Sequence, residues 1–158
     1  ELDGAGEVRA EIRRLVYELR PPALDELGLG EAISAFVQQI NNHSPTRICF
    51  SAQSGALEAL PAAVEAAVYR LVQEGVNNVL RHAQAANCTV ECCHVEGQLI
   101  LTIRDDGRGV SSEARGGVGM LSMRERVEEL GGKLTISSAE PKGTLLTAVL
   151  PYSGITDD

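Results

Sequence analysis

A strand that runs directly into a glycine-rich turn is the feature that most restricts how this chain can fold. In residues 99–103, Leu99, Leu101 and Ile103 share one apolar face of a strand, and continuing the alternation places Asp105 on that face. A buried carboxylate is costly unless it accepts hydrogen bonds from the protein or from a ligand. Gly107 and Gly109 follow, and glycine lets another group approach the backbone closely. The pattern therefore predicts the mouth of a pocket.

A second glycine cluster follows a few residues later. It comprises Gly116, Gly117 and Gly119 and leads into an amphipathic helix predicted over residues 120–130. Backbone N–H groups at a helix start, together with the helix dipole, favour an anion. The cluster is therefore a candidate phosphate site, although the glycine spacing alone favours two ordinary glycine turns, one in each cluster.

Length and charge limit the classes of function. The chain has 158 residues, which suits one domain with or without an appended segment, and its net charge of -8 argues against binding to nucleic acid or to an anionic membrane. No stretch approaches the ~20 apolar residues that span a bilayer, and the N-terminus has no signal-peptide character. We therefore expect a cytoplasmic chain without membrane contact. Its abrupt start suggests a piece of a longer protein.

Four cysteines raise the question of a metal site: Cys49, Cys88, Cys92 and Cys93. Cys92 and Cys93 are neighbours in a predicted strand and therefore point to opposite faces, and the sequence has no Cys-x-x-Cys pair. Small buried strand residues are the favoured interpretation.

Periodicity predicts a two-layer architecture. Amphipathic patterns and proline breaks predict helices over residues 7–20, 30–41 and 61–82, in addition to 120–130. Alternating patterns predict strands over residues 47–51, 87–95, 99–105, 133–137 and 144–150, with a linker at 24–29 and a loop at 52–60. Hairpin connections are too short for parallel crossovers. We expect an α/β two-layer sandwich, with a mixed, mostly antiparallel five-stranded sheet covered on one face by about three helices.

The helix predicted over residues 61–82 carries polar residues beside its apolar face. Glu74 and Asn78 are four residues apart and stand one above the other, with Arg81 on the same flank. Carboxylate and amide oxygens suit Mg²⁺, and Arg81 and His82 would then reach phosphate oxygens. A solvated helix flank is the alternative, and the helix alone favours it.

Three segments together resemble the nucleotide-binding boxes of sensor histidine kinases. Residues 74–83 (EGVNNVLRHA) resemble the asparagine box, residues 105–109 (DDGRG) the D-x-G-x-G box, and residues 117–120 (GVGM) the second glycine box, in the family's order and at compatible spacing. Residues 19–24 and 123–127 further resemble the NarL/DesK-type subfamily. The resemblance covers nearly the whole chain.

The resemblance implies the Bergerat ATP-binding fold, which histidine kinases share with DNA gyrase and MutL. Asp105 would accept the exocyclic amine of adenine. Asn78 would bind Mg²⁺, and Glu74 would help to position the metal or act as a base. Arg81 would contact phosphate, and His82 would lie near the nucleotide. The other residues implied to contact or enclose ATP are Gly107, Gly109, Gly117, Val118, Gly119, Met120 and Thr144.

The resemblance also implies a domain organisation and partners. Residues 1–22 would end a dimerisation and phosphoacceptor hairpin, 23–151 would form the catalytic domain, and 152–158 a tail. The family's phosphoacceptor lies in a His-Asp pair that this sequence lacks. The fragment is therefore expected to bind ATP without phosphorylating itself and to lack the dimer interface of its homodimeric parent kinase. The hairpin and a response regulator are the implied protein partners.

Three other functions share these sequence boxes. An ATPase of the gyrase or MutL kind would use Glu74 to activate water, but the short stretch between Gly109 and Gly117 favours the kinase. Residues 19–29 argue against a serine kinase of the anti-sigma type. A degenerate nucleotide-binding scaffold is disfavoured because all the key positions are filled.

Overall fold

The computed structural model describes residues 20–109 and 118–152, and the structural statements below refer to these residues. Four α-helices are described, together with a π-helix, η1, that continues α4: α2 (Pro22–Leu27), α3 (Leu29–His43), α4 (Ala62–Asn78), η1 (Val79–Ala83) and α6 (Val118–Glu129). The strands are β1 (Arg47–Ala52), β2 (Asn87–Val95), β3 (Gln98–Asp105), β4 (Lys133–Ser138) and β5 (Thr144–Pro151).

The five strands form one sheet in the order β1-β2-β3-β5-β4. Only β1 and β2 pair in parallel, because α4 crosses over between them. The other three pairs are antiparallel. The sheet is therefore mixed and mostly antiparallel, as the hairpin spacing predicted.

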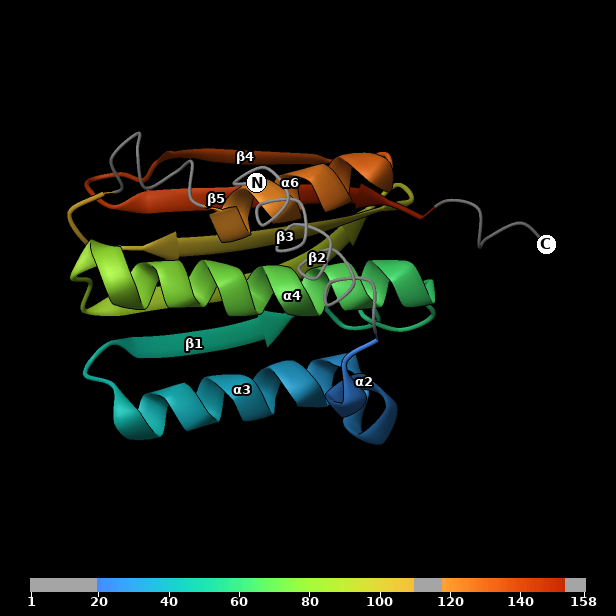
Figure 1. The fold of residues 1–158 in the computed structure, drawn as a ribbon, viewed down its shortest axis with the longest axis horizontal. Helices are drawn as coiled ribbons and strands as arrows, with labels where there is room; N and C mark the ends of the chain where they lie inside the picture. The colour runs from blue at the N-terminus through green and yellow to red at the C-terminus, as the bar shows by residue number, and fades with distance from the viewer. Residues whose placement is uncertain (1–19, 110–117, 153–158) are drawn as a thin grey trace, which may run out of the picture.

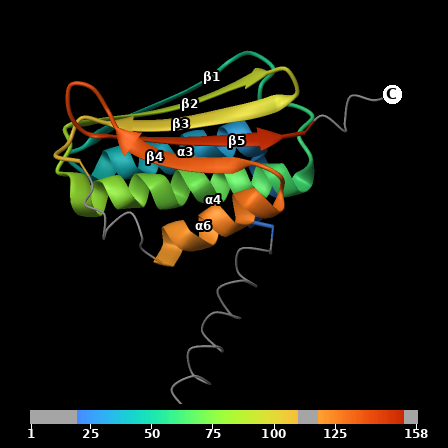
Figure 2. The same cartoon turned by 90° about the horizontal axis from the view of Figure 1, so that it is seen from above.

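The helices α3, α4 and α6 lie on the same face of this sheet, as the view in Figure 2 shows. The core fills the space between the two layers. Val68 and Leu71 of α4 and Leu99 and Leu101 of β3 have no exposed surface. Alternate residues of each strand point toward the helices, so the apolar residues at these positions form the sheet side of the core. The predicted two-layer sandwich is confirmed.

The prediction of a linker over residues 24–29 is wrong, since helix α2 occupies most of this segment. Pro22 is the first helical residue, a position where its missing N–H costs nothing, and Gly28 ends the helix with φ of 84°. Leu24 is 3% exposed and packs into the core. A helix of six residues is held by such packing and is too short for its periodicity to be recognised.

The helix predicted over residues 61–82 changes its geometry before it ends. It is α-helical to Asn78 and continues as the π-helix η1, after which Gln84 takes a left-handed conformation. Single π-turns inside helices are uncommon and frequently occur at functional sites. Arg81 and His82 therefore lie on a turn whose geometry the apolar periodicity did not predict.

The exposure of the four cysteines depends on where each lies in the sheet. Cys88 and Cys92 are buried, as predicted, whereas Cys93 is half-buried and Cys49 is exposed, so that the prediction is wrong for Cys49. The described residues hold no cluster of three or more His, Cys, Asp or Glu side chains suited to a metal ion. No described helix is both long enough and apolar enough to cross a bilayer.

Candidate functional site

The carboxylate of Asp105 lies on the inner face of the sheet, at the end of β3, and is 3% exposed. Its Oδ1 atom accepts a hydrogen bond of 2.8 Å from the backbone N–H of Gly107. Burial raises the pKa of this carboxyl above its ordinary value, although hydrogen bonds from the backbone of Gly107 and Thr144 oppose the shift. The predicted inward-facing carboxylate is therefore present, and it keeps accepting capacity for a ligand.

The start of β5 lies against the backbone of Asp105. Gly143 has φ of 105°, and a side chain there would overlap the carbonyl oxygen of Asp105. Gly109, with φ of 89°, lies close to the carbonyl oxygen of Gly143. Thr144 follows, and its buried Oγ1 has no hydrogen-bond partner among the described residues. A buried carboxylate and an unpartnered buried hydroxyl at neighbouring positions suit a polar ligand that enters between them.

Cys88 pairs with Asp105 across the β2–β3 ladder, so that both side chains face the helices. Burial, with a smaller effect from the carboxylates of Asp105 and Asp106, raises the pKa of the Cys88 thiol to about 12. This cysteine is therefore a neutral packing residue beside the carboxylate.

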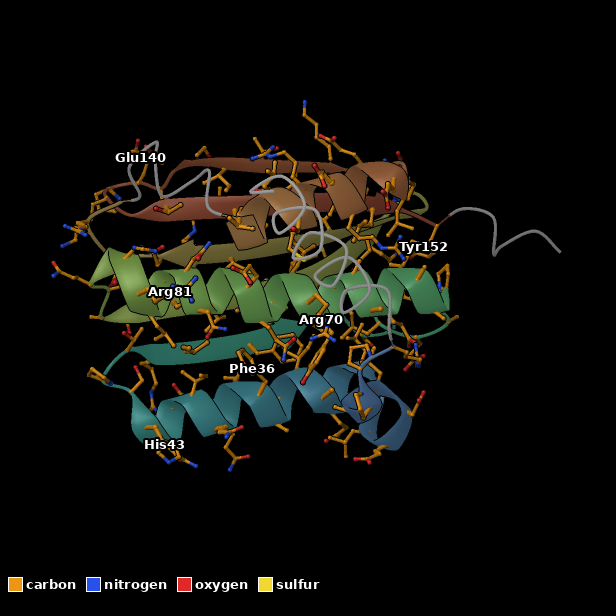
Figure 3. All side chains as sticks on the ribbon, in the orientation of Figure 1. Phe36, His43, Arg70, Arg81, Glu140 and Tyr152 are labelled. Atoms are coloured by element: carbon orange, nitrogen blue, oxygen red, sulfur yellow. The ribbon has the colours of Figure 1, made fainter. Side chains whose placement is uncertain are left out.

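Glu74, Asn78 and Arg81 come together on the outer flank of α4 and η1. Nη2 of Arg81 donates a hydrogen bond of 2.9 Å to Oδ1 of Asn78 and lies 3.7 Å from Oε2 of Glu74. Figure 3 labels Arg81 near the end of the long helix. The two oxygens predicted to bind a metal thus face one cationic group, the Arg81 guanidinium.

The second glycine box meets this group at the start of α6. Gly119 lies against the Glu74 carboxylate, and a side chain at position 119 would overlap it. Met120 is buried in the core, whereas Val118 is 55% exposed. The prediction for Gly117 lies outside the described residues.

The two groups lie toward the same end of the molecule. In Figure 1 the end of β3, the start of β5 and the η1 end of α4 lie on one side. Gly75 permits this arrangement, because a side chain there would overlap the side chain of Ile103 on β3. Residues far apart in the sequence, from Glu74 to Thr144, are therefore brought into one region.

Two neighbours of these residues escaped the sequence analysis. Asp106 accepts hydrogen bonds of 2.9 Å from the backbone N–H groups of Ala86 and Asn87 and from the Asn87 side chain. Nε of Arg108 donates a bond of 2.9 Å to the carbonyl oxygen of His82, whose side chain is half-buried. The alternation of β3 did place Asp106 opposite to Asp105, but no spacing in the sequence identifies these partners.

A separate surface groove of about 450 Å³ lies between α3 and η1. Phe36 and His43, labelled in Figure 3, line it together with Leu80 of η1. None of the predicted site residues lines this groove.

The fold and the placement of the glycine boxes define an ATP-binding domain of the Bergerat type. Residues 63–154 match the model of the family described as histidine kinase-, DNA gyrase B- and HSP90-like ATPases, and the chain belongs to this family. Similar proteins include the sensor histidine kinase MctS of Rhizobium johnstonii, 38% identical over 90% of this chain, and the histidine-protein kinase/phosphatase DegS of Brevibacillus brevis, 34% identical over 91%. The chain spans only 32% and 38% of the length of these two relatives.

Solved structures support the fold. The histidine kinase domain of the blue-light activated kinase EL346 of Erythrobacter litoralis superposes with a TM-score of 0.63 and is 26% identical, over 83% of this chain and 64% of that one. The catalytic domain of the histidine kinase ThkA gives a TM-score of 0.59 at 14% identity, over 81% and 92% of the two chains, and is a likeness of fold alone. The resemblance to sensor histidine kinases of the NarL/DesK type is confirmed by these comparisons.

Proposed function

We propose that this chain is the catalytic domain of a two-component sensor histidine kinase that presents the γ-phosphate of ATP to a phosphoacceptor histidine, for relay to a response-regulator aspartate. The observation that carries the proposal is the buried carboxylate of Asp105 beside the unpartnered hydroxyl of Thr144. An adenine base presents an amine donor and ring-nitrogen acceptors, which complement such a pair. The names of the relatives support the kinase reading.

Base recognition is assigned to the Asp105 region. Ionised Asp105 accepts a hydrogen bond from the exocyclic amine of adenine. The buried hydroxyl of Thr144, which has no hydrogen-bond partner among the described residues, forms its hydrogen bond with the bound nucleotide. Gly107 and Gly109 keep the turn free of side chains where the base enters. Phosphoryl transfer depends mainly on positioning and on neutralising charge, so fixing the base sets the position of the distant γ-phosphate.

Phosphate recognition is assigned to the Glu74 region. Arg81 and His82 contact or approach the phosphates, and Gly117, Val118 and Gly119 enclose them, while the buried Met120 of the same box anchors the start of α6 in the core. Oδ1 of Asn78 and Oε2 of Glu74 fit a divalent cation, because they are oxygen ligands that already face a positive group. Mg²⁺ bound there would neutralise phosphate charge. Arg81 contacts both oxygens, so a metal held by Asn78 and Glu74 would replace its guanidinium, which would then be available for a phosphate oxygen.

The remaining assignments concern the parent protein. We assign residues 1–22 to the dimerisation hairpin of the parent kinase and residues 23–151 to its catalytic domain. The chain is cytoplasmic, binds the parent kinase's phosphoacceptor hairpin and makes no contact with nucleic acid or membrane. The parent is a homodimer, and the fragment does not phosphorylate itself.

Calorimetric titration of Mg-ATP tests the proposal. The chain should bind Mg-ATP, and Asp105→Asn should abolish binding, because the amide oxygen accepts from the Gly107 N–H and leaves the NH₂ donor facing the adenine amine. Glu91→Gln is the matched control, since Glu91 is an exposed carboxylate on β2. Bound ATP should then phosphorylate a separately supplied hairpin of a related kinase. Hydrolysis of ATP without transfer would instead support the ATPase of the gyrase or MutL kind, and absence of binding would overturn the proposal.

A further inference from the structure

The segment from His82, near the end of η1, to Asn87, at the start of β2, is held by the turn that follows β3. Asp106 binds its second half, at Ala86 and Asn87, and Arg108 binds its first half, at His82. The backbone N–H of Asp106 also donates to the carbonyl oxygen of Asn87, at 3.2 Å. Two side chains of one short turn therefore grip a segment about twenty residues earlier in the chain.

The grip of Asp106 is the tighter half. Its Oδ1 accepts from two consecutive backbone N–H groups at 2.9 Å, and its Oδ2 accepts from the Asn87 side chain at 2.9 Å. These bonds hold the pKa of the Asp106 carboxyl below its ordinary value, which is the mark of a carboxylate bound in its charged form. The start of β2 is thereby fixed to the same turn that carries Gly107 and Gly109.

The contact of Arg108 supports a turn that has little support of its own. The helix η1 ends where Gln84 takes φ of 51°, in the left-handed region. A π-turn has uncommon geometry, and the last carbonyl groups of a helix lack partners within it. Nε of Arg108 satisfies the carbonyl oxygen of His82 with a charge-assisted bond of 2.9 Å.

We propose that Asp106 and Arg108 form a clasp that positions η1, and with it Arg81 and His82, relative to the turn that binds the base. This inference rests on the proposed function, because it concerns the relative positions of the residues that bind the base and those that bind the phosphates. Both are positioning residues: they contact the chain that carries the phosphate-binding side chains. The base end and the phosphate end of the site then keep a fixed separation before ATP arrives.

Hydrogen–deuterium exchange of the nucleotide-free 158-residue chain tests the clasp without any ligand. Arg108→Met should accelerate exchange in peptides that cover η1 and the following segment to Asn87 by about threefold to tenfold, the range expected for loss of one hydrogen bond. The matched control is Arg104→Met, since Arg104 is exposed, carries the same charge, and makes no hydrogen bond or ion pair in the described part of the chain. Unchanged exchange in Arg108→Met, or equal acceleration in both variants, would overturn the clasp.

Titration with Mg-ATP and with adenosine tests the consequence. Arg108→Met should weaken Mg-ATP by about fivefold, within the range of one charge-assisted bond, and leave adenosine unchanged. Arg104→Met should change neither. Weaker Mg-ATP with unchanged exchange would mean that Arg108 touches phosphate directly, and would overturn the positioning role. If the unsubstituted chain fails to bind Mg-ATP, the proposed function and the positioning role both fall, whereas the exchange data still decide whether the clasp exists.

Discussion

The pKa values of two adjacent aspartates depend on the local surroundings of each carboxyl group. Asp105 and Asp106 follow each other in the sequence, yet burial raises the pKa of the first and backbone N–H groups lower the pKa of the second. We expect a carboxyl-carbon NMR titration of the nucleotide-free chain to place the Asp105 midpoint above 3.8 and the Asp106 midpoint below it. Similar midpoints for the two groups would contradict the described environments.

These opposite shifts give opposite effects on stability. Asp106 contributes stability that is present above its unfolded value of 3.8 and is lost as the pH falls through its lower folded pKa. Asp105 behaves in the reverse sense: its contribution is complete below 3.8 and is lost as the pH rises through its higher folded pKa. Neutralising the pair by Asp105→Asn and Asp106→Asn, one at a time, should therefore alter the pH dependence of urea unfolding in opposite directions.

At the scale of elements, the close approach of α4 to β3 depends on Gly75. A side chain there would overlap Cδ1 of Ile103, so we expect Gly75→Ala to destabilise the fold by about 1–3 kcal/mol, although alanine favours a helix. Urea unfolding measures the change. Ile103→Val, which removes Cδ1, should restore part of the loss in the double variant. Gly30→Ala in α3 is the matched control, because a Cβ at position 30 would lie 3.7 Å from its nearest neighbour, Cδ1 of Leu57, which is an ordinary contact.

The short helix α2 offers a second test at this scale. Leu24 is 3% exposed and lies in the core, whereas Leu27 in the same helix is 48% exposed. Leu24→Ala should reduce the free energy of unfolding by about 2–5 kcal/mol, the usual cost of a buried leucine, and Leu27→Ala by less than about 0.5 kcal/mol. Equal losses would show that α2 does not dock as described.

Elements also show what the sequence could predict. Strand β3 and the inward position of Asp105 follow from strict alternation, which a strand with one buried face imposes over its whole length. Helix α2 was missed because its six residues are stabilised by contacts with distant residues, and the π-turn was missed because apolar periodicity does not report hydrogen-bond register. The spacing of Glu74 and Asn78 placed them on one flank of the helix, and only the family resemblance gave them a role. The bonds of Asp106 and Arg108 follow from neither.

At the scale of the whole molecule, one core joins all the described elements. The buried residues run from Leu24 to Leu150 and belong to a single cluster. We therefore expect one cooperative unfolding transition, with coincident urea curves from circular dichroism and from the fluorescence of tyrosine, since Tyr69 is buried in α4. Mg-ATP at 100 times its Kd should raise the free energy of unfolding by about 2.7 kcal/mol, and adenosine should act in the same direction. Separate transitions would indicate independent folding units.

The pairing of β3 with β5 has a consequence for how the chain is made. Asp105 stands at the end of one strand and Thr144 at the start of the other, and the register joins Arg104 to Leu145. If adenine binds at Asp105 and Thr144 as proposed, β5 must leave the ribosome before that site can form, and adenine binding there cannot assist any earlier stage of folding. Binding of nucleotide by a nascent chain would therefore show that β5 has paired with β3.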